Sequence, residues 1–265
     1  MKRLKLYQVD AFANALFRGN PAAVCPLEQW LSDELMQSIA SENNLSETAF
    51  FVRAGEHYEI RWFTPNTEVA LCGHATIASA FVIFNYLNHL TPYITFQSKS
   101  GELRVIQQNQ ALQLDFPALS YKKTELPKTI MDHLSVTPQE VYQSEFDLLC
   151  VFENEDMIKN ATPDLQALAK LDDRGFIFTS LSKKADVYSR CFYPGCDVPE
   201  DPVTGSAHCV IVPYWCHRLN KTTIHAIQGL KRQGELMCEV KHNRVLLAGQ
   251  CHLYLEGTLH LEKEI

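Results

Sequence analysis

The chain contains 265 residues, which is enough for one large domain or two modest lobes. Hydrophobic residues make up 46% of it and charged residues 21%, a balance typical of a folded globular protein and not of a disordered chain. The formal net charge is −7 and basic residues form no run longer than a pair, so the sequence carries no electrostatic signal for binding nucleic acid. A small molecule is therefore the expected partner.

Cysteine usage and the N-terminal stretch bear on the cellular compartment. The nine cysteines are odd in number and include no C-x-x-C pair, which argues against a disulfide framework and against a zinc site. The stretch MKRLKLYQVDAF lacks the apolar core of roughly 7 to 15 residues that a signal peptide needs. No apolar run approaches the roughly 20 residues of a membrane-spanning helix. We expect reduced thiols, no membrane partner and a cytoplasmic location.

The first half of the chain contains both strand and helix patterns. Residues 1–12 and 58–63 alternate apolar and polar side chains with period two, as half-buried strands do. Residues 32–44 fit a surface helix, with Ser32 as its cap and apolar residues on one face. Residues 73–84 fit a second helix that is apolar on every side, and this pattern predicts a helix buried in a core.

The second half follows a stretch without periodicity. Residues 117–129 contain two prolines and are the expected linker between two lobes. Residues 137–145 fit a short helix with a threonine cap and a proline at its first position. Residues 205–215 fit another apolar helix, which Pro213 should kink or end. Further strands are expected at 111–116, 185–192, 234–240 and 252–259.

The two halves repeat one order of features. RWFTPNTEV at 61–69 matches RCFYPGCDV at 190–198 without a gap, with arginine, phenylalanine, proline and valine at the same places. In both copies a glycine and an apolar helix pattern follow the match. Because strand, turn, glycine and helix recur in the same order, the pattern indicates an internal duplication.

The repeat predicts an α+β fold of two pseudo-symmetric lobes, residues 1–118 and 119–265, with the terminal strand free to pack on the first lobe. Each lobe is expected to be a mostly antiparallel, barrel-like sheet around a central apolar helix. Only the N-terminus of such a helix reaches the surface, where free N–H groups and the positive end of the helix dipole favour an anion. Two such ends around one cleft predict a small-molecule carboxylate as the ligand.

Five motifs give the chain a family resemblance. The sequence resembles the PhzF-like family of the phenazine-biosynthesis isomerase, whose fold is similar to that of diaminopimelate epimerase. The resemblance spans nearly the whole chain and implies a homodimer. The motifs are GNPAAV (19–24), NLSETAF (44–50), TPNTEVALCGHAT (64–76), EDPVTGSAHC (200–209) and QGLKRQG (228–234).

Two carboxylates are the predicted catalytic groups. On its own, Glu47 in LSETAFF fits a solvated glutamate at a strand edge or a cap, whereas the resemblance implies that it carries a proton between two carbons of the substrate. On its own, Asp201 in EDPVTGS fits a turn or a helix cap. The resemblance implies that Asp201 lies in the active site, where it orients the substrate or assists proton transfer.

The entrances of the two apolar helices supply the predicted substrate-binding residues. Gly73 lets the backbone approach a ligand, His74 can donate a hydrogen bond, and the resemblance implies that this pair lines the pocket. Gly205 and Ser206 form the equivalent entrance of the second lobe, where simple helix capping is the alternative interpretation. The sequence contains no P-loop, dinucleotide fingerprint or metal-ligand motif, so neither a cofactor nor a metal is expected.

The roles of several other residues stay open. Cys72 resembles one of the paired cysteines of diaminopimelate epimerase, but by the offset of the repeat its counterpart is Asp201, which disfavours a racemase with two thiols. A small residue packed at a helix start is the alternative for Cys72. Asn20 fits a turn that could edge the pocket. Arg61 and Arg190 match across the repeat and fit either structural ion pairs or substrate clamps.

The predicted function is that of a cofactor-independent isomerase. It would move a proton and a double bond on a small carboxylate-bearing substrate by general acid/base catalysis through Glu47, with Asp201 assisting. One alternative is an epimerase or racemase of an amino or hydroxy acid. An alternative of another class is a small-ligand-binding protein without turnover, since a fold does not by itself determine a function.

Overall fold

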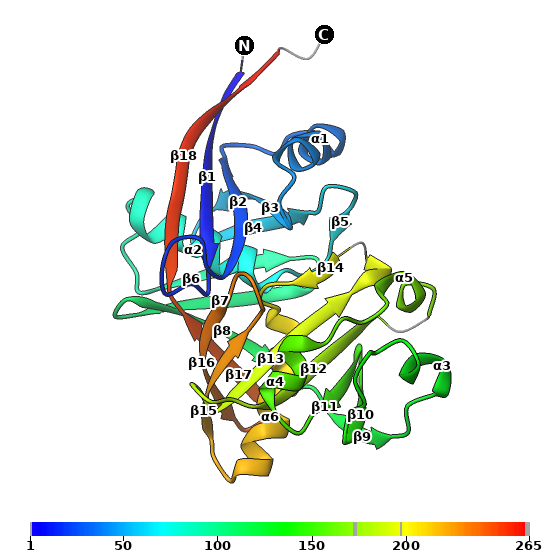
Figure 1. Ribbon diagram of the computed structural model, residues 1–265. Helices are drawn as coiled ribbons and strands as arrows, with labels where there is room; N and C mark the ends of the chain where they lie inside the picture. Colours follow the sequence, from blue (N-terminus) through cyan, green and yellow to red (C-terminus); the bar gives the residue numbers. More distant parts are fainter. Residues whose placement is uncertain (1, 172–173, 197, 263–265) are drawn as a thin grey trace. The chain divides into compact units, whose positions relative to one another are not determined.

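The computed structural model describes residues 2–171, 174–196 and 198–262 (Figure 1). The chain divides into two compact units: residues up to Asp115 together with those from Ala248 onward form the first, and Phe116–Leu247 form the second. Strands β8 (Ala111–Pro117) and β17 (Arg244–Gly249) run across the two points of division. The last strand, β18 (Cys251–Leu261), belongs to the first unit.

The first unit is built around strand β1 and its neighbours. β1 pairs antiparallel with β2 and with β18, and the pair β1–β18 forms a long two-stranded ribbon (Figure 1). β2 is parallel to β3, with helix α1 in the connection between them. β4 pairs antiparallel with β3 and β5 and parallel with β6, which continues through β7 to β8. The elements are β1 (Lys2–Ala11), β2 (Asn20–Leu27), α1 (Asp33–Asn43), β3 (Glu47–Ala54), β4 (His57–Phe63), β5 (Glu68–Val69), α2 (Gly73–Tyr86), β6 (Tyr93–Ser98) and β7 (Gly101–Gln108).

The second unit repeats this order. β11 is parallel to β12, β12 is antiparallel to β13, and β13 pairs antiparallel with β14 and parallel with β15. Helix α6 lies between β14 and β15 in the chain, as α2 lies between β5 and β6. The elements are β9 (Tyr121–Thr124), α3 (Lys128–Met131), β10 (Glu140–Ser144), β11 (Asp147–Val151), α4 (Glu155–Asn160), α5 (Leu165–Leu168), β12 (Gly175–Leu181), β13 (Val187–Tyr193), the 3-10 turn Pro194–Cys196, β14 (Val198–Asp201), α6 (Gly205–Leu219), β15 (Thr223–Gln228) and β16 (Gly234–Lys241).

These matching orders confirm the predicted α+β fold of two pseudo-symmetric halves. Parallel pairing of β2 with β3 corresponds to β11 with β12, and parallel pairing of β4 with β6 corresponds to β13 with β15. Between these parallel pairs the remaining partners are antiparallel. The duplication indicated by the sequence repeat therefore extends through the whole strand order.

Helix α2 is enclosed on every side from His74 to Ala80, as its apolar pattern predicted. The end that reaches the surface, however, is its C-terminus, at Asn85 and Tyr86, and not its N-terminus, where Gly73 is half-buried. Its buried residues include Ala75, Ile77 and Ala78 on different faces of the helix. The hydroxyl of Thr76 donates to the carbonyl of Cys72 (2.6 Å) and that of Ser79 to the carbonyl of Ala75 (2.7 Å). Because these buried polar groups are satisfied within the helix, enclosure leaves neither hydroxyl without a hydrogen bond.

Helix α6 does not end at Pro213 but continues to Leu219. Proline has no N–H, so the carbonyl four residues earlier, that of Cys209, lacks its helical donor. The backbone N–H of Leu119 donates to this carbonyl instead (2.9 Å). A neighbouring segment of the second unit thus supplies the missing hydrogen bond, and the helix tolerates its proline.

Two further local predictions, at the start of α1 and over 137–145, had opposite outcomes. α1 begins after Ser32, whose hydroxyl accepts a hydrogen bond from the N–H of Leu35 (3.3 Å), as expected of its cap. The helix predicted over 137–145 is wrong, because this segment contains strand β10. β10 pairs antiparallel with both β9 and β11, and these tertiary hydrogen bonds override a weak local helix signal. No helix within the described residues is long and apolar enough to cross a membrane.

Candidate active site

Glu47 and His74 meet in the first unit. Glu47 is the first residue of β3, where it lies beside Ala22 of the parallel strand β2. His74 is the second residue of the buried helix α2. Oε2 of Glu47 lies 3.1 Å from Nε2 of His74, and their side chains are only 15% and 5% exposed. The register of one strand and the start of one helix therefore bring together two of the predicted site residues.

The contact between these two side chains is close but not well aligned. Oε2 of Glu47 and Nε2 of His74 are both buried, and among the described residues neither makes a well-aligned hydrogen bond. Buried polar atoms in native proteins nearly always have a partner, and the exceptions are frequently functional. Both atoms therefore retain hydrogen-bonding capacity at the entrance of α2, beside half-buried Gly73.

The other ring nitrogen of His74 faces two residues. Nδ1 lies 3.3 Å from the amide nitrogen of Asn20 and 3.5 Å from the sulfur of Cys72. Asn20 is the first residue of β2, and its carbonyl oxygen accepts a hydrogen bond from the hydroxyl of Ser46 (3.3 Å). Cys72 is the N-cap residue of α2 and makes no side-chain capping bond. A chain of contacts thus runs from Ser46 through Asn20 and His74 to Glu47.

Burial and neighbouring charges both act on the pKa values of Cys72 and His74. Burial and, to a smaller extent, the Glu47 carboxylate raise the pKa of the Cys72 thiol to about 11. Burial lowers the pKa of His74, whereas the charges of a Cys72 thiolate and of Glu47 raise it, and the net direction is upward. Near neutral pH the thiol is protonated, so the thiolate's share of this upward shift is absent there, and the charge of Glu47 opposes the lowering of the pKa by burial.

The same three side chains offer metal-ligand atoms within 4.8 Å of one another. Their contacts, however, use opposite nitrogens of the imidazole: Cys72 approaches Nδ1 and Glu47 approaches Nε2. A ligand shell around one ion requires donor atoms that converge on one point. In these contacts Cys72 and Glu47 approach different nitrogens of the ring, and no single nitrogen serves both.

Asp201 lies at the end of β14 in the second unit. Its Oδ2 accepts a hydrogen bond from the hydroxyl of Thr204 (2.6 Å), and its backbone carbonyl accepts one from the side-chain amide of Gln228 (2.8 Å). The carbonyl oxygen of that amide accepts from the backbone N–H of Thr204 (3.0 Å). Asp201 and Gln228 together fix the N-cap residue of α6.

Gly205 and Ser206 begin helix α6, as predicted. The hydroxyl of Ser206 accepts a hydrogen bond from Nη2 of Arg174 (3.2 Å). Two nitrogens of Arg174 also donate to the two oxygens of Asp147 (2.8 and 2.7 Å), whose carboxylate is almost completely buried. A guanidinium whose charge is balanced by a buried carboxylate therefore lies at the start of α6, where it holds the Ser206 hydroxyl in place.

The structure gathers the predicted residues into two groups, each described within its own unit. Glu47, Gly73 and His74 lie together in the first, and Asp201, Gly205 and Ser206 lie together in the second. Sequence reasoning did not identify the contacts of Asn20 and Cys72 with His74, nor the pair Arg174–Asp147. No local motif marks Arg174 or Asp147, because their partners are far away in the sequence.

The proposed match of Cys72 with Asp201 needs correction. Cys72 is the N-cap residue of α2, and the residue in this place at the start of α6 is Thr204. Twelve positions separate Arg61 from Gly73, but fifteen separate Arg190 from Gly205, so three extra residues shift the offset. By its place in the fold, the counterpart of the thiol is therefore a hydroxyl and not a carboxylate.

The two matched arginines form structural ion pairs. Nε and Nη2 of Arg61 donate to the two carboxylate oxygens of Glu68, and the same atoms of Arg190 donate to Glu200 in the equivalent place. Arg190 also donates to two backbone carbonyls at the C-terminal end of helix α4, those of Ile158 in its last turn and of Ala161, its C-cap. With the bond from Nη1 of Arg61 to Asp33, these contacts engage every nitrogen of both guanidinium groups, which favours the structural interpretation over that of substrate clamps.

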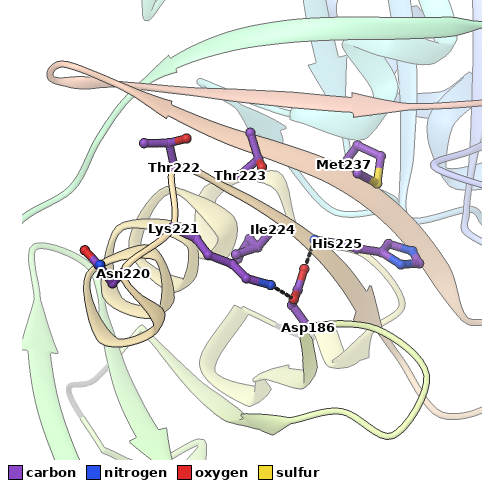
Figure 2. A pocket seen from close by; sticks show the side chains of 8 residues that line it. All are labelled: Asp186, Asn220, Lys221, Thr222, Thr223, Ile224, His225 and Met237. Atoms are coloured by element: carbon purple, nitrogen blue, oxygen red, sulfur yellow. Dashed lines mark hydrogen bonds and ion pairs between the residues drawn. The ribbon is translucent and has the colours of Figure 1, made fainter.

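A separate cavity of about 450 Å³ lies in the second unit, beyond the C-terminal end of α6 (Figure 2). Asp186 lies on one side of it and accepts hydrogen bonds from Nζ of Lys221 and from the backbone N–H of His225. No predicted site residue lines this cavity. Its lining consists of Asp186, Asn220, Lys221, Thr222, Thr223, Ile224, His225 and Met237.

Known proteins resemble the chain over almost its whole length. The profile of a family described as phenazine biosynthesis-like protein matches residues 9–257. An uncharacterised isomerase of Pseudomonas aeruginosa is 47% identical over 258 residues, which cover 97% of this chain and 99% of that protein. The crystal structure of a phenazine biosynthesis protein of the PhzF family from Enterococcus faecalis has 44% identity and a TM-score of 0.95, covering 98% of this chain and 100% of that one.

A more distant structure shares the fold alone. A protein of Pseudomonas aeruginosa described as a predicted epimerase is 21% identical, with a TM-score of 0.73, and the alignment covers 98% of this chain and 100% of that one. The fold is thus common to proteins of the PhzF family and to an epimerase-like protein, in agreement with the predicted fold class. On the evidence of the family profile and of the 47% identity over nearly the entire length, the chain belongs to the phenazine biosynthesis-like, or PhzF-like, protein family.

Proposed function

We propose that this protein is an isomerase that moves a proton on a small carboxylate-bearing molecule without a cofactor, with Glu47 as the group that carries the proton. The observation that carries the proposal is the 3.1 Å contact between buried Glu47 and His74, whose facing atoms lack well-aligned hydrogen bonds among the described residues. The names of relatives of the family, which include an isomerase at 47% identity, support the reaction class.

The reaction begins with the carboxylate of Glu47. It takes a proton from an acidic C–H bond, and the electron pair of that bond forms a new double bond while the existing double bond shifts along the substrate. Glu47 then returns its proton to a second carbon, so the enzyme is regenerated and atoms and charge balance. A hydrogen bond from His74 and the free N–H groups at the start of α2 stabilise the negative charge that develops on the substrate.

The residues of the second unit have the predicted role of substrate binding. The N–H groups of Gly205 and Ser206 begin a helix of 15 residues, whose dipole favours an anion such as a carboxylate. Arg174, paired with Asp147, donates to the Ser206 hydroxyl and orients it. Asp201 accepts a hydrogen bond of 2.6 Å from the hydroxyl of Thr204 and can act by positioning this hydroxyl. Its alternative role is to orient a polar substituent of the substrate.

Hydrogen exchange in deuterated water tests this proposal. The protein is incubated with a panel of cyclic and acyclic, saturated and unsaturated amino and hydroxy carboxylates, and deuterium uptake is followed by mass spectrometry and NMR. Uptake accompanied by movement of a double bond supports the isomerase. Uptake at a single stereocentre supports the epimerase or racemase instead, and a compound that binds without exchange supports the binding protein.

Two further expectations stay predictions. The homodimer implied by the family resemblance is tested by sedimentation equilibrium of the purified chain. The cytoplasmic location is tested by fractionation of the cells that produce it.

A further inference from the structure

Both neighbours of His74 Nδ1 can donate a hydrogen bond. The carbonyl oxygen of Asn20 is occupied by the hydroxyl of Ser46, and this orients the amide so that its NH₂ group faces the ring at 3.3 Å. An asparagine amide nitrogen donates and does not accept. Asn20 is completely buried at the start of β2, so packing holds the amide in this place.

Cys72 has the same character on the other side of Nδ1. Its sulfur lies 3.5 Å from that nitrogen, and the side chain is buried at the N-cap of α2. Since burial raises the pKa of this thiol to about 11, the sulfur carries a proton near neutral pH. A protonated sulfur can donate its S–H to the imidazole and accepts only weakly. An amide donor and a weakly accepting sulfur leave a proton on Nδ1 without a good acceptor.

We propose that Asn20 is a positioning residue that, together with Cys72, holds His74 as the neutral tautomer with its proton on Nε2, so that this N–H faces Glu47. The purpose of this tautomer rests on the proposed function: a neutral donor can stabilise charge on the substrate without neutralising the carboxylate that must accept a proton. The argument for the tautomer itself does not use that function. It uses the contacts of His74 with Asn20 of β2, Cys72 of α2 and Glu47 of β3.

His208 provides an opposite case within the same protein. It lies in the buried helix α6 and is completely buried. Its Nδ1 lies 2.8 Å from the backbone carbonyl of Thr204, which only accepts hydrogen bonds. Nδ1 of His208 must therefore carry the proton, whereas the contacts of His74 require a bare Nδ1. One spectrum of this protein should contain both tautomers.

Long-range ¹H–¹⁵N NMR of the full chain labelled with ¹⁵N-histidine tests the proposal at neutral pH without any substrate. The variants His74→Asn and His208→Asn identify the two residues among the ten histidines. The expected result is an unprotonated Nδ1 and a protonated Nε2 for His74, with the reverse for His208. Protons on both nitrogens of His74, or on Nδ1 alone, would overturn the proposal.

The role of Asn20 is tested by exchanging its donor for an acceptor. In Asn20→Asp a carboxylate faces Nδ1, and the expected result is that Nδ1 of His74 becomes protonated. Cys72→Ala is the control, because it adds no acceptor, leaves the Asn20 amide in place and should leave Nδ1 unprotonated at neutral pH. An unprotonated Nδ1 in Asn20→Asp would show that Asn20 does not control the tautomer.

If Asn20→Asp does not fold, Asn20→Leu replaces it. This variant removes one donor without adding charge, so Nδ1 should take up its proton at a higher pH than in the unmodified protein. An unchanged titration would overturn the role of Asn20. These spectra require no turnover, so they test the tautomer separately from the function. If the protein exchanges no substrate hydrogen, the proposed function fails, and the inference about His74 still stands when the spectra show the expected tautomer.

Discussion

Glu47 and Gly175 occupy the same position in the two pseudo-symmetric units. Glu47 precedes by three residues Phe50, which pairs with Arg61 across strands β3 and β4. Gly175 precedes by three residues Phe178, which pairs with Arg190 across strands β12 and β13. A carboxylate in one unit thus corresponds to a residue without a side chain in the other. The duplicated fold therefore carries an acidic side chain at this position in its first half alone.

Gly175 is required by the packing of its neighbours. A Cβ atom at this position would lie 2.2 Å from Cε1 of Tyr193 and 2.9 Å from a carboxylate oxygen of Asp147. We therefore predict that Gly175→Ala lowers the free energy of unfolding by about 2 kcal/mol or more, as overpacking of a core does. Urea denaturation measures this loss. In a Tyr193→Leu background the cost should become smaller, and an equal cost in both backgrounds would disprove the assigned clash.

Arg190 should contribute more stability than its counterpart Arg61. The side chain of Arg190 is 7% exposed and satisfies two backbone carbonyls as well as Glu200, whereas that of Arg61 is 20% exposed and shares its charge with Asp33 at the surface. We predict that Arg190→Met costs about 3 kcal/mol, since it strands buried partners. Arg61→Met should cost about 1 kcal/mol. Equal losses in urea denaturation would contradict this ranking.

His208 should make the protein less stable in mild acid. Burial lowers the pKa of His208 from 6.5 to about 4, so between these values the unfolded chain binds a proton that the folded chain does not. Stability is therefore fully present above pH 6.5 and falls as the pH drops toward 4, by about 3 kcal/mol. Unfolding free energies measured across this range should fall less in His208→Asn, and an identical slope would refute the assignment.

The cysteines should differ sharply in reactivity. Burial raises the pKa of the Cys72 thiol to about 11, which leaves little thiolate at neutral pH, whereas Cys196 is exposed. We predict that iodoacetamide labels Cys196 of the folded protein first and Cys72 only slowly. Peptide mass spectrometry identifies the labelled thiols. Rapid labelling of Cys72, or loss of substrate exchange in Cys72→Ala, would favour the epimerase alternative with a reactive thiol.

Much of the fold could be predicted because it is encoded in local patterns. The apolar sequence of residues 73–84 requires a buried helix, and the structure shows α2 enclosed with its hydroxyls bonded to its own backbone. Strands expected at 58–63 and 234–240 occur as β4 and β16. Segment 137–145 was misjudged because the partners of β10 lie elsewhere in the chain and carry no local signal.

The site was less predictable than the fold. Glu47 and His74 were identified by motif, but Asn20 reaches His74 only through the packing of β2 against α2, across 54 positions of sequence. The match between Cys72 and Asp201 failed because three extra residues precede α6, a shift that a gapless comparison cannot detect. Contacts that depend on strand register and on insertions can be identified only in the three-dimensional structure.

The measurement that tests the central claim most directly compares hydrogen exchange by the unmodified protein and by Glu47→Gln. The amide keeps the shape of Glu47 but cannot accept the proton, so exchange into a substrate from deuterated water should fall by at least about 100-fold while circular dichroism and unfolding remain similar. Asp201→Asn serves as the comparison and should retain more exchange than Glu47→Gln. Full exchange by a folded Glu47→Gln protein would contradict the account.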